Sequence, residues 1–597
     1  MTNTKIFSLF ILITLISLFL FPINKAYADI YNVDVFYDAY DANPGDGICA
    51  DGTGSCTLRA AVEEANLNAG SADTIYFANP GTYTVTWASI PVTDRLTVQG
   101  SSQRDIIIEG NLTDIIFDIY GLEITATFND LTIKNGYSAI RSNYAAVNVN
   151  DCLMFNNIGF SGAAIKATNG FLTINDSTLT NNTTSSWGGA IVLDETELNI
   201  NNSELAYNTS GQGGGAIYVF YGEDFTITNS YIHHNVAASG SGGAIYYAGI
   251  GTSVNIDNVN ISYNEASNSS GGLFLGHASS ISITNSLITN NLAMGSGYAY
   301  QGAGGLALAA AQGPMSVLIA DTRIAGNETY MNGGGIRAFF SVDSHVINIV
   351  NSDISKNSAK NIGGAIFNYA DLNSEAAAHF TLNISDSNIE QNAAYDNGAI
   401  YAEAANINIT RSGINENYAE DNLSKQVELV GGLLDISNST LSSNKAYSVI
   451  TVDHDLVLST GSMGSVVNLH SVTIAENSGY GIVNNLSGKQ FYVANSLLAD
   501  NQMNEDCYGD FYTLEYNFIG INPTSCSGFS ASSNDIVGTP STPVNALLTT
   551  LDFYGGNTRL HEWSSASPVN SSSTNCLSED QQGNSRSDTC DRGSREL

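Results

Sequence analysis

A short motif recurs along most of this 597-residue chain, and it restricts the chain to repeat architectures. The motif reads apolar-x-apolar-x-Asn/Asp-Ser-x-apolar-x-x-Asn, as in residues 172–182 (LTINDSTLTNN) and 281–291 (ISITNSLITNN). Its closing residue returns every 24 to 36 positions, as Asn157, Asn182, Asn208, Asn235, Asn264, Asn291, Asn327, Asn357, Asn392, Asn417, Asn444, Asn477 and Asn501. Because each repeat contacts only its neighbours, such a chain lengthens without a growing central core.

The spacing of apolar residues inside the motif indicates strands. Leu172, Ile174 and Leu179 are separated by polar residues with the period of a strand. Each repeat therefore holds two or three short strands joined by turns, and stacked repeats bury the apolar faces. We expect an all-β fold, a single-stranded right-handed parallel β-helix of about thirteen coils. At roughly 4.8 Å per coil, the rod is on the order of 60 Å long.

Small residues mark the corners of the predicted coils. Gly-Gly-Ala-Ile occurs at residues 188–191, 214–217, 242–245 and 363–366, where glycine permits positive φ and close backbone approach. The recurrent asparagines tolerate left-handed turns and can form a ladder of side-chain amides. Cys152 stands where the motif has Ser, which predicts a buried structural thiol.

The sequence divides into four parts. Residues 1–28 have the charge, apolar core and small-residue site of a cleaved signal peptide, although an uncleaved membrane anchor is the alternative. Residues 29–125 form an N-terminal cap with one predicted helix at 57–67, N-capped by Thr57. Residues 126–505 form the β-helix, and residues 506–597 a Cys-containing C-terminal domain. No further transmembrane span is expected after cleavage.

Cysteine usage and charge indicate an exported protein that does not bind nucleic acid. Local pairing predicts three short-loop disulfides, Cys49 with Cys56, Cys507 with Cys526 and Cys576 with Cys590. The net charge is -37, and the twenty Lys and Arg residues are scattered singly, so they form no cluster for phosphate contacts.

The best candidate for a metal site is an acidic loop near the N-terminus. Asp41, Asn43 and Asp46, with Asp38 and Asp51 nearby, are oxygen ligands interspersed with glycine, a composition that suits Ca²⁺. The spacing differs from that of an EF-hand loop. A solvated turn closed by a disulfide is the other interpretation.

Both ends of the chain resemble known bacterial modules. Residues 41–66 (DANPGDGICADGTGSCTLRAAVEEAN) resemble the module named for its Cys-Ser-Leu-Arg-Glu-Ala signature, with Ala60 in place of Glu. Residues 516–520, 555–558, 567–569, 580–583 and 590–593 resemble a choice-of-anchor domain of type Q. The repeats are similar to those of chlamydial polymorphic outer-membrane proteins. These resemblances imply a secreted or cell-surface bacterial protein, with adhesion as the usual suggestion.

Parallel β-helices of the pectin-lyase-like class also include polysaccharide lyases and hydrolases. The Asn-Thr-Asp, Asp-Asp, Gly-His-Gly and Arg-Ile-Lys motifs that mark pectin hydrolases of this fold are absent from the sequence. We therefore expect no catalytic and no cofactor-binding residues, and we interpret His233 and His234 as solvated outer-face residues.

The expected function is non-catalytic adhesion or glycan binding, with a host or neighbouring cell surface as partner. A lyase or hydrolase is the alternative. Tyrosines that follow the glycine corners, Tyr218, Tyr221, Tyr246 and Tyr247, either stack on sugar rings or pack between coils.

Overall fold

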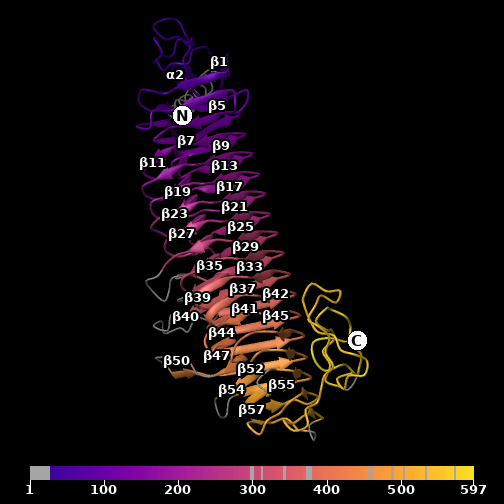
Figure 1. The fold of residues 1–597 in the computed structure, drawn as a ribbon. Coiled ribbons are helices and arrows are strands. Elements are labelled where there is room, and N and C mark those ends of the chain that lie inside the picture. The colour runs from indigo at the N-terminus through magenta and orange to yellow at the C-terminus, as the bar shows by residue number, and fades with distance from the viewer. Residues whose placement is uncertain are drawn as a thin grey trace, which may run out of the picture.

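The computed structural model describes residues 27–295, 302–310, 313–340, 345–370, 380–452, 456–458, 461–485, 490–501, 505–530, 534–570 and 573–596. The predicted signal peptide therefore lies almost wholly outside the described residues. The described chain forms about 15 turns of a parallel β-helix, with one helix near its N-terminal end. The predicted parallel β-helix with a helix-containing cap is confirmed (Figure 1).

One repeat shows how the motif becomes a coil. Strand β13 (Phe171–Asn175) ends at Asp176, which adopts φ 51°, and β14 (Thr178–Thr180) ends at Asn181, with φ 53°. Asp and Asn tolerate this left-handed conformation because their short polar side chains bond locally. Each turn rotates the chain to the next face, and Leu172, Ile174 and Leu179 point inward and are fully buried.

Three parallel sheets run along the axis and are named sheets A, B and C. Sheet B contains β3 (Gly81–Thr84), β6 (Ile106–Glu109), β8 (Thr132–Lys134), β10 (Leu153–Phe155), β14, β18 (Glu204–Ala206), β22 (Tyr231–His233), β26 (Asn260–Ser262), β30 (Leu287–Thr289), β34 (Arg323–Ala325), β38 (Asp353–Ser355), β42 (Asn388–Glu390), β45 (Gly413–Asn415), β48 (Thr440–Ser442), β53 (Thr473–Ala475), β56 (Leu497–Ala499), β59 (Phe518–Ile519) and β61 (Ile536–Val537). Sheet C contains β11 (Ile158–Gly159), β15 (Thr183–Thr184), β19 (Thr209–Ser210), β23 (Val236–Ala237), β27 (Glu265–Ala266), β31 (Leu292–Ala293), β35 (Glu328–Thr329), β39 (Ser358–Ile362), β43 (Ala393–Asp396) and β46 (Tyr418–Ala419).

Sheet A supplies two strand segments to most coils. The first segments of the coils are β12 (Ile165–Thr168), β16 (Ile191–Asp194), β20 (Ile217–Val219), β24 (Ile245–Ala248), β28 (Leu273–Gly276), β32 (Leu306–Ala310), β36 (Ile336–Phe340), β40 (Ile366–Ala370), β49 (Ser448–Val452), β54 (Tyr480–Asn484), β57 (Cys507–Asp510) and β60 (Cys526–Ser527). The segments before the turn into sheet B are β13, β17 (Glu197–Asn201), β21 (Phe225–Thr228), β25 (Ser253–Asp257), β29 (Ser280–Thr284), β33 (Ser316–Ala320), β37 (His345–Val350), β41 (Phe380–Ser385), β52 (Ser465–His470), β55 (Gln490–Ala494) and β58 (Tyr512–Thr513). Both segments join in β7 (Ile115–Asn129), β9 (Ser138–Asn150), β44 (Ile400–Thr410) and β47 (Lys425–Ser437), and the first coils use β1 (Ile30–Val33), β2 (Ala72–Phe77), β4 (Ile90–Val92) and β5 (Arg95–Gln99).

The closing asparagines form the predicted amide ladder in the interior. In one rung, Asn208 Nδ2 donates to Asn235 Oδ1 at 3.0 Å and to the Leu179 carbonyl at 2.9 Å. The same Asn235 Oδ1 accepts the Asn208 backbone N–H at 3.0 Å. This pattern continues from Asn157 to Asn501, so these buried amides are satisfied from coil to coil.

A second internal row holds the motif serines. The Ser177 hydroxyl accepts the Cys152 backbone N–H at 3.0 Å, and the Ser203 hydroxyl accepts that of Ser177 at 3.1 Å. Cys152 occupies the serine position of its own coil and is fully buried and free of a disulfide, as predicted. Burial raises the pKa of its thiol to about 12.

The glycine corners bring neighbouring coils into close contact. Gly188 has φ 56°, and a Cβ placed on Gly189 would lie 2.2 Å from the Gly215 carbonyl oxygen. Only glycine fits both requirements, because a side chain would clash with the backbone of the next coil. The predicted role of the Gly-Gly pairs is confirmed.

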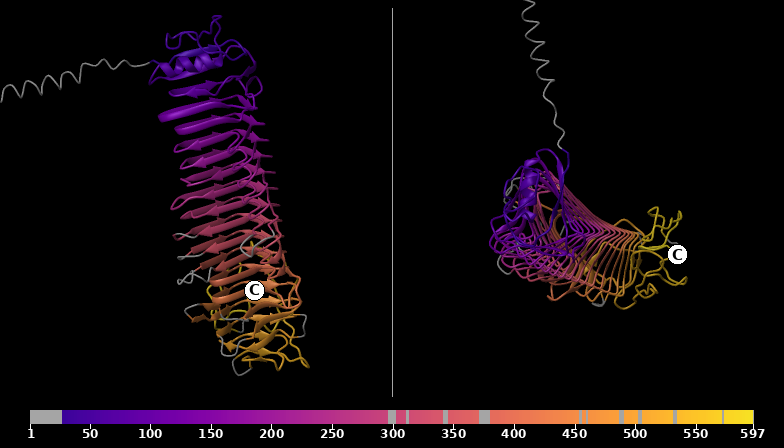
Figure 2. Two further views of the ribbon diagram at one scale, coloured as in Figure 1. Left: turned by 90° about the vertical axis from the view of Figure 1, so that its left-hand side faces the viewer. Right: turned by 90° about the horizontal axis from the view of Figure 1, so that it is seen from above.

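The helix α2 (Leu58–Leu67) lies over the first coils at the N-terminal end of the rod (Figure 2). Thr57 is its N-cap, and the Thr57 hydroxyl accepts the Ala60 N–H at 3.1 Å. Arg59 is buried, with Nε 2.8 Å from the Asp38 carboxylate and with the Ala88 and Ser89 carbonyls as further acceptors. The helix closes an apolar end that would otherwise be an open sheet edge.

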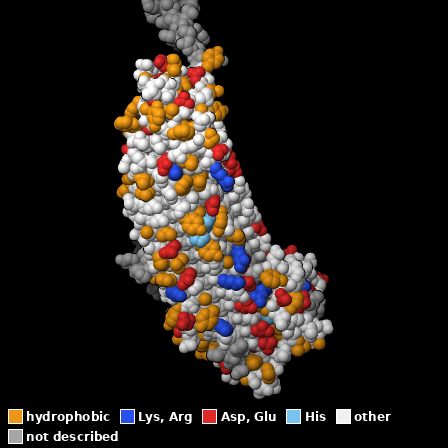
Figure 3. Space-filling view, turned by 45° about the horizontal axis from the view of Figure 1, so that its top comes forward, with side chains coloured by type: hydrophobic (Ala, Val, Ile, Leu, Met, Phe, Trp, Pro, Cys, Tyr) orange, Lys and Arg blue, Asp and Glu red, His pale blue; other side chains and the backbone are white. Residues whose placement is uncertain are grey.

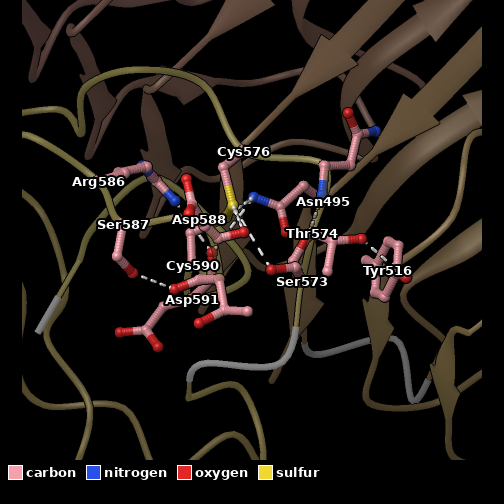
Figure 4. Close-up of a disulfide and its surroundings, with 12 residues drawn as sticks. Asn495, Tyr516, Ser573, Thr574, Cys576, Arg586, Ser587, Asp588, Cys590 and Asp591 are labelled. Carbon is pink, nitrogen blue, oxygen red and sulfur yellow. Dashed lines mark hydrogen bonds between the residues drawn. A yellow bond between two sulfur atoms is a disulfide. The ribbon is translucent and has the colours of Figure 1, made fainter.

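The chain after β61 folds back along the outside of the last coils (Figures 1 and 2). We call residues 539–596 the C-terminal segment. Its disulfide, Cys576–Cys590, lies beside Asn495, whose Nδ2 donates to the Asp591 carbonyl at 3.2 Å (Figure 4). The other predicted disulfides, Cys49–Cys56 and Cys507–Cys526, are also present.

The strand ladder includes parts of both predicted end domains, because β1 pairs with β2 and β59 pairs with β61. The boundaries at residues 125 and 505 stay predictions. Among the described residues, no helix has the length and apolar character that a membrane span requires.

Candidate functional site

A long groove follows the turns between sheets A and B. Its first part has a volume of about 800 Å³ and extends from Asp176 to Leu287. A second part of about 540 Å³ shares Asn285 and Leu287 with the first and continues to Asp386 and Asn388. We call the two parts together the sheet B groove. Its length spans eight successive coils, from the turn at Asp176 to the turn at Asp386.

The floor of the groove is built by the motif Asn/Asp-Ser. The residue before the inward serine adopts a left-handed conformation, with φ 47° at Asn202, 51° at Asn229 and 54° at Asn258. Their side chains bond along the axis, for example Asn258 Nδ2 to Asn229 Oδ1 at 2.8 Å. The same turn that closes each coil thus places one carboxamide or carboxylate per coil on the groove floor.

The wall on the sheet B side carries larger side chains. Glu204 and Tyr231 line the first part, and both contact His233. His233 Nε2 lies 2.8 Å from Glu204 Oε1, and the imidazole stacks on the Tyr231 ring with 3.8 Å between centroids. The predicted solvated position of His233 is therefore wrong, because this side chain is buried between its neighbours on the outer face.

His234 does face solvent. Its ring lies between Tyr207 and Tyr263, with centroids 5.0 and 5.2 Å away. All three residues are in the left-handed turn that follows sheet B, which stacks their rings from coil to coil. The rings pack this turn, which is at the other end of the sheet B strands from the groove floor.

Acidic side chains predominate in the sheet B groove. Among its described lining residues, the acidic ones are Asp176, Glu204, Asp321, Asp353 and Asp386, and the basic one is Arg323. Arg323 Nε lies 3.0 Å from Asp353 Oδ2 and so offsets one of these charges. The space-filling view also shows acidic side chains over much of the rod, with a few Lys and Arg in its upper part and more in its lower part (Figure 3).

Asp353 differs from the other groove carboxylates in its surroundings. Burial raises the pKa of Asp353 above the ordinary value, although Ser355 and Arg323 act in the opposite direction. Its Oδ2 accepts from Ser355 at 2.9 Å, and its buried Oδ1 has no partner among the described residues. A carboxyl group with a raised pKa beside a groove can donate a proton.

The corner tyrosines lie on the opposite side of the turn, on sheet A. The rings of Tyr218, Tyr246 and Phe274 stack in parallel, with centroids 4.6 and 4.5 Å apart. Tyr247 is fully buried inside the coil, in agreement with the packing alternative for this residue. Because the stacked rings cover each other's faces, they present edges rather than faces to a ligand.

A smaller hollow of about 580 Å³ lies beside this stack. Tyr221 and Ile250 stand at its rim, 71% and 62% exposed, and Glu195 and Glu223 face it from the loops between strand segments. Tyr221 is the corner tyrosine whose ring is free to meet a ligand.

The predicted calcium ligands take part in a network of backbone contacts. Asp41 accepts N–H bonds from Asn43 at 2.7 Å and Ala50 at 2.9 Å, and Asp46 accepts that of Ile48 at 2.9 Å. In the described residues, no group of three or more His, Cys, Asp and Glu side chains could hold a metal ion. The calcium loop stays a prediction.

Comparison by sequence with protein-family models and with curated proteins finds no match. Comparison with solved structures finds, among others, two lyases. The pectate lyase Pel9A has 15% sequence identity over 96% of each chain, and the PL6-family alginate lyase AlyGC has 9% identity over 85% of this chain and 98% of its own. Both TM-scores are 0.19, so the fold is established by the strand pairing described above. The three family resemblances stay predictions.

Proposed function

We propose that the protein binds an extended, uncharged glycan in the sheet B groove and leaves it chemically unchanged. The observation that carries the proposal is the groove floor, where each coil adds one carboxamide or carboxylate at a pitch of about 4.8 Å. That pitch is close to the length of one sugar ring in an extended glycan. A linear ligand can therefore repeat similar hydrogen bonds with successive coils, while Tyr231 offers an aromatic surface.

Charge favours a neutral ligand over an acidic one. Five carboxylates and one guanidinium line the groove, and the chain carries a net charge of -37. A polyuronate would meet like charges along the whole groove, and such contacts cost several kcal/mol. Neutral sugar hydroxyls instead donate to Asp176, Glu204 and Asp321.

An extracellular, cell-surface setting is consistent with this function. Three disulfides suit an oxidising compartment, and the resemblances of residues 41–66 and of the C-terminal segment also imply a surface protein. Binding glycan on a host or neighbouring cell would make the protein an adhesin.

One observation favours a second candidate, a glycoside hydrolase or polysaccharide lyase. Asp353 lines the groove, is partly buried and has a raised pKa, as a general acid requires. A hydrolase needs a second carboxylate on the other side of the scissile bond. Asp321 and Asp386 line the same part of the groove.

One experiment separates the two candidates. The purified protein without residues 1–28 is incubated with neutral and acidic plant, algal and host glycans, with and without Ca²⁺, and retention and product mass are measured together. We expect retention of a neutral glycan with no shortened product. Shortened or unsaturated products would contradict the binding proposal, and loss of those products in Asp353→Asn would identify the acid.

A matched pair of variants locates the ligand. Tyr231→Ala removes the aromatic wall of the groove, and we expect affinity to fall at least tenfold. Tyr418→Ala removes a tyrosine that is 45% exposed on sheet C, and affinity should stay within twofold. Equal effects of both variants would exclude the groove as the binding surface.

A further inference from the structure

The sheet B groove ends abruptly on the C-terminal side. Its last lining residues come from the C-terminal segment and are Phe553, Gly556 and Asn557. Asn557 is fixed from both sides, because its Nδ2 donates to Asn351 Oδ1 at 3.0 Å and its carbonyl accepts Asn388 Nδ2 at 2.8 Å. The segment therefore crosses the groove at the coil of Asn388.

Beyond this crossing, the face of sheet B is filled. Arg559 lies over β42 and β45, with NH1 3.3 Å from Glu390 and 2.8 Å from Glu416. On the next coils, Thr440 Oγ1 donates to Gln581 Oε1 at 2.6 Å, and Ser442 Oγ lies 2.7 Å from His561 Nε2. A ligand in the groove cannot continue along these coils without displacing the segment.

The end of the groove also offers an apolar surface. Phe553 is 52% exposed although it lines the groove. The floor beside it is polar, with Asp321, Asn351 and Asp386. An aromatic ring at the end of a polar groove is suited to stack on a terminal sugar ring, since the apolar face of the sugar covers it.

We propose that the C-terminal segment makes the sheet B groove blind-ended, so that the protein recognises one end of a glycan chain. The proposal rests on the proposed function and adds the form of the ligand. The terminal sugar stacks on Phe553 and bonds to Asn557, and the rest of the chain extends toward Asp176. The contacts of Arg559 and Gln581 hold the C-terminal segment in place, so that it blocks the end of the groove.

The first test uses the neutral glycan that the protein retains, as oligomers of increasing length, in isothermal titration. A blind groove binds one protein per glycan chain at every length. An open groove binds more proteins as the glycan lengthens, and that result would overturn the proposal. If no glycan is retained at all, the proposed function itself fails, and the two failures are thereby distinguished.

The second test blocks the ends of the oligomer separately. A bulky group on the end that enters the groove should weaken binding at least tenfold, and the same group on the other end should change it less than twofold. Equal binding of both blocked forms would contradict end recognition.

A pair of variants tests whether the C-terminal segment causes the discrimination between the two blocked oligomers. In Phe553→Ala combined with Asn557→Ala, the oligomer blocked at the entering end should regain at least tenfold in affinity. Leu547→Ala, which changes a residue 42% exposed in the same segment and outside the groove, should leave the discrimination intact. A thermal unfolding midpoint within a few degrees of wild type confirms that each variant is folded. A double variant that is folded and still discriminates would exclude Phe553 and Asn557 as the stop.

Discussion

Sheet B has two regions that share one strand register but face different surroundings. From β14 to β38 its outer face borders the open groove, whereas from β42 to β56 it is covered by the C-terminal segment. The interior is alike in both, since the asparagine ladder runs without a break beneath them. The difference must therefore lie in the outward residues.

Those outward residues explain which region is covered. At the first outward position of the strands, the open region has Glu204, Tyr231 and Arg323 but also Thr178, and the covered region has Gly413, Thr440 and Thr473 but also Leu497. A Cβ placed on Gly413 would lie 3.3 Å from the Arg559 carbonyl. Small residues allow the segment to approach the sheet, and large polar ones leave a face for a ligand.

The largest expected effect tests whether the asparagine ladder stabilises both regions of sheet B to the same extent. Asn327→Ala, beneath the groove, removes the acceptor of the buried Asn291 N–H and one of the two acceptors of Asn291 Nδ2, which keeps only the Ile261 carbonyl. Asn417→Ala does the same to Asn392 beneath the covered region. We expect each variant to lower the free energy of unfolding by about 3 kcal/mol or more in urea titration. A large loss in one region and none in the other would break the comparison.

A smaller loss of stability is expected when a contact between the C-terminal segment and sheet B is removed. Gln581→Ala removes an Nε2 donor to the Ser412 carbonyl at 3.3 Å and an acceptor for Thr440. We expect about 2 kcal/mol less protection against hydrogen exchange in residues 573–596. The matched variant in the open region, Leu287→Ala, changes a groove residue that is 42% exposed and should alter stability by less than about 0.5 kcal/mol. Equal losses would mean that the groove side chains also hold the fold.

Raising the pH from 4 to 7 should weaken the end of the ladder in the covered region. Asp506 replaces asparagine as the last rung, accepting Asn501 Nδ2 at 2.7 Å, and burial raises the pKa of Asp506 to about 7. A raised carboxyl pKa gives stability that is complete below the unfolded value and is lost as pH rises through the folded value. Stability should therefore fall between pH 4 and about 7 and then level. Asp506→Asn should flatten this part of the profile, and an unchanged slope would contradict the assignment.

The smallest expected effect is a weaker attachment of the C-terminal segment to sheet B at acidic pH. His561 Nε2 lies 2.7 Å from Ser442, Nδ1 lies 2.7 Å from the Thr549 carbonyl, and burial lowers the pKa of this imidazole despite Glu476 and Asp500 nearby. A lowered pKa gives stability that is present above the unfolded value, about 6.5, and is lost as pH falls. Proteolysis of the C-terminal segment should thus be faster at pH 5 than at pH 7.5. Equal rates would show that His561 does not control docking.

Periodicity along the chain was enough to predict the β-helix and its internal asparagine ladder. The closing asparagines indicate a ladder because one residue type at one place in every coil must stack on itself. Cys152 in the serine position and the short-loop disulfides followed from local spacing. The positions of Tyr246 and Tyr247 were also within reach, since strand alternation after the inward Ile245 places Tyr246 outside and Tyr247 inside.

The sheet B groove and the docking of the C-terminal segment could not be predicted in the same way. Gln581 and Thr440 are 141 residues apart, and nothing in either local pattern indicates that they meet. The groove depends on which outer faces stay uncovered, which is a property of that long-range docking. The Asn/Asp-Ser motif supplies the groove floor, but Asn and Asp are also common turn residues, so the motif alone does not indicate a groove.

The most direct test of the central claim is hydrogen exchange of the protein saturated with the neutral glycan that it retains. We expect slower exchange in the turns from Asp176 to Asn351 and in residues 553–557, with no change around Tyr221 on sheet A. Protection confined to sheet A, with none along the groove, would contradict that claim.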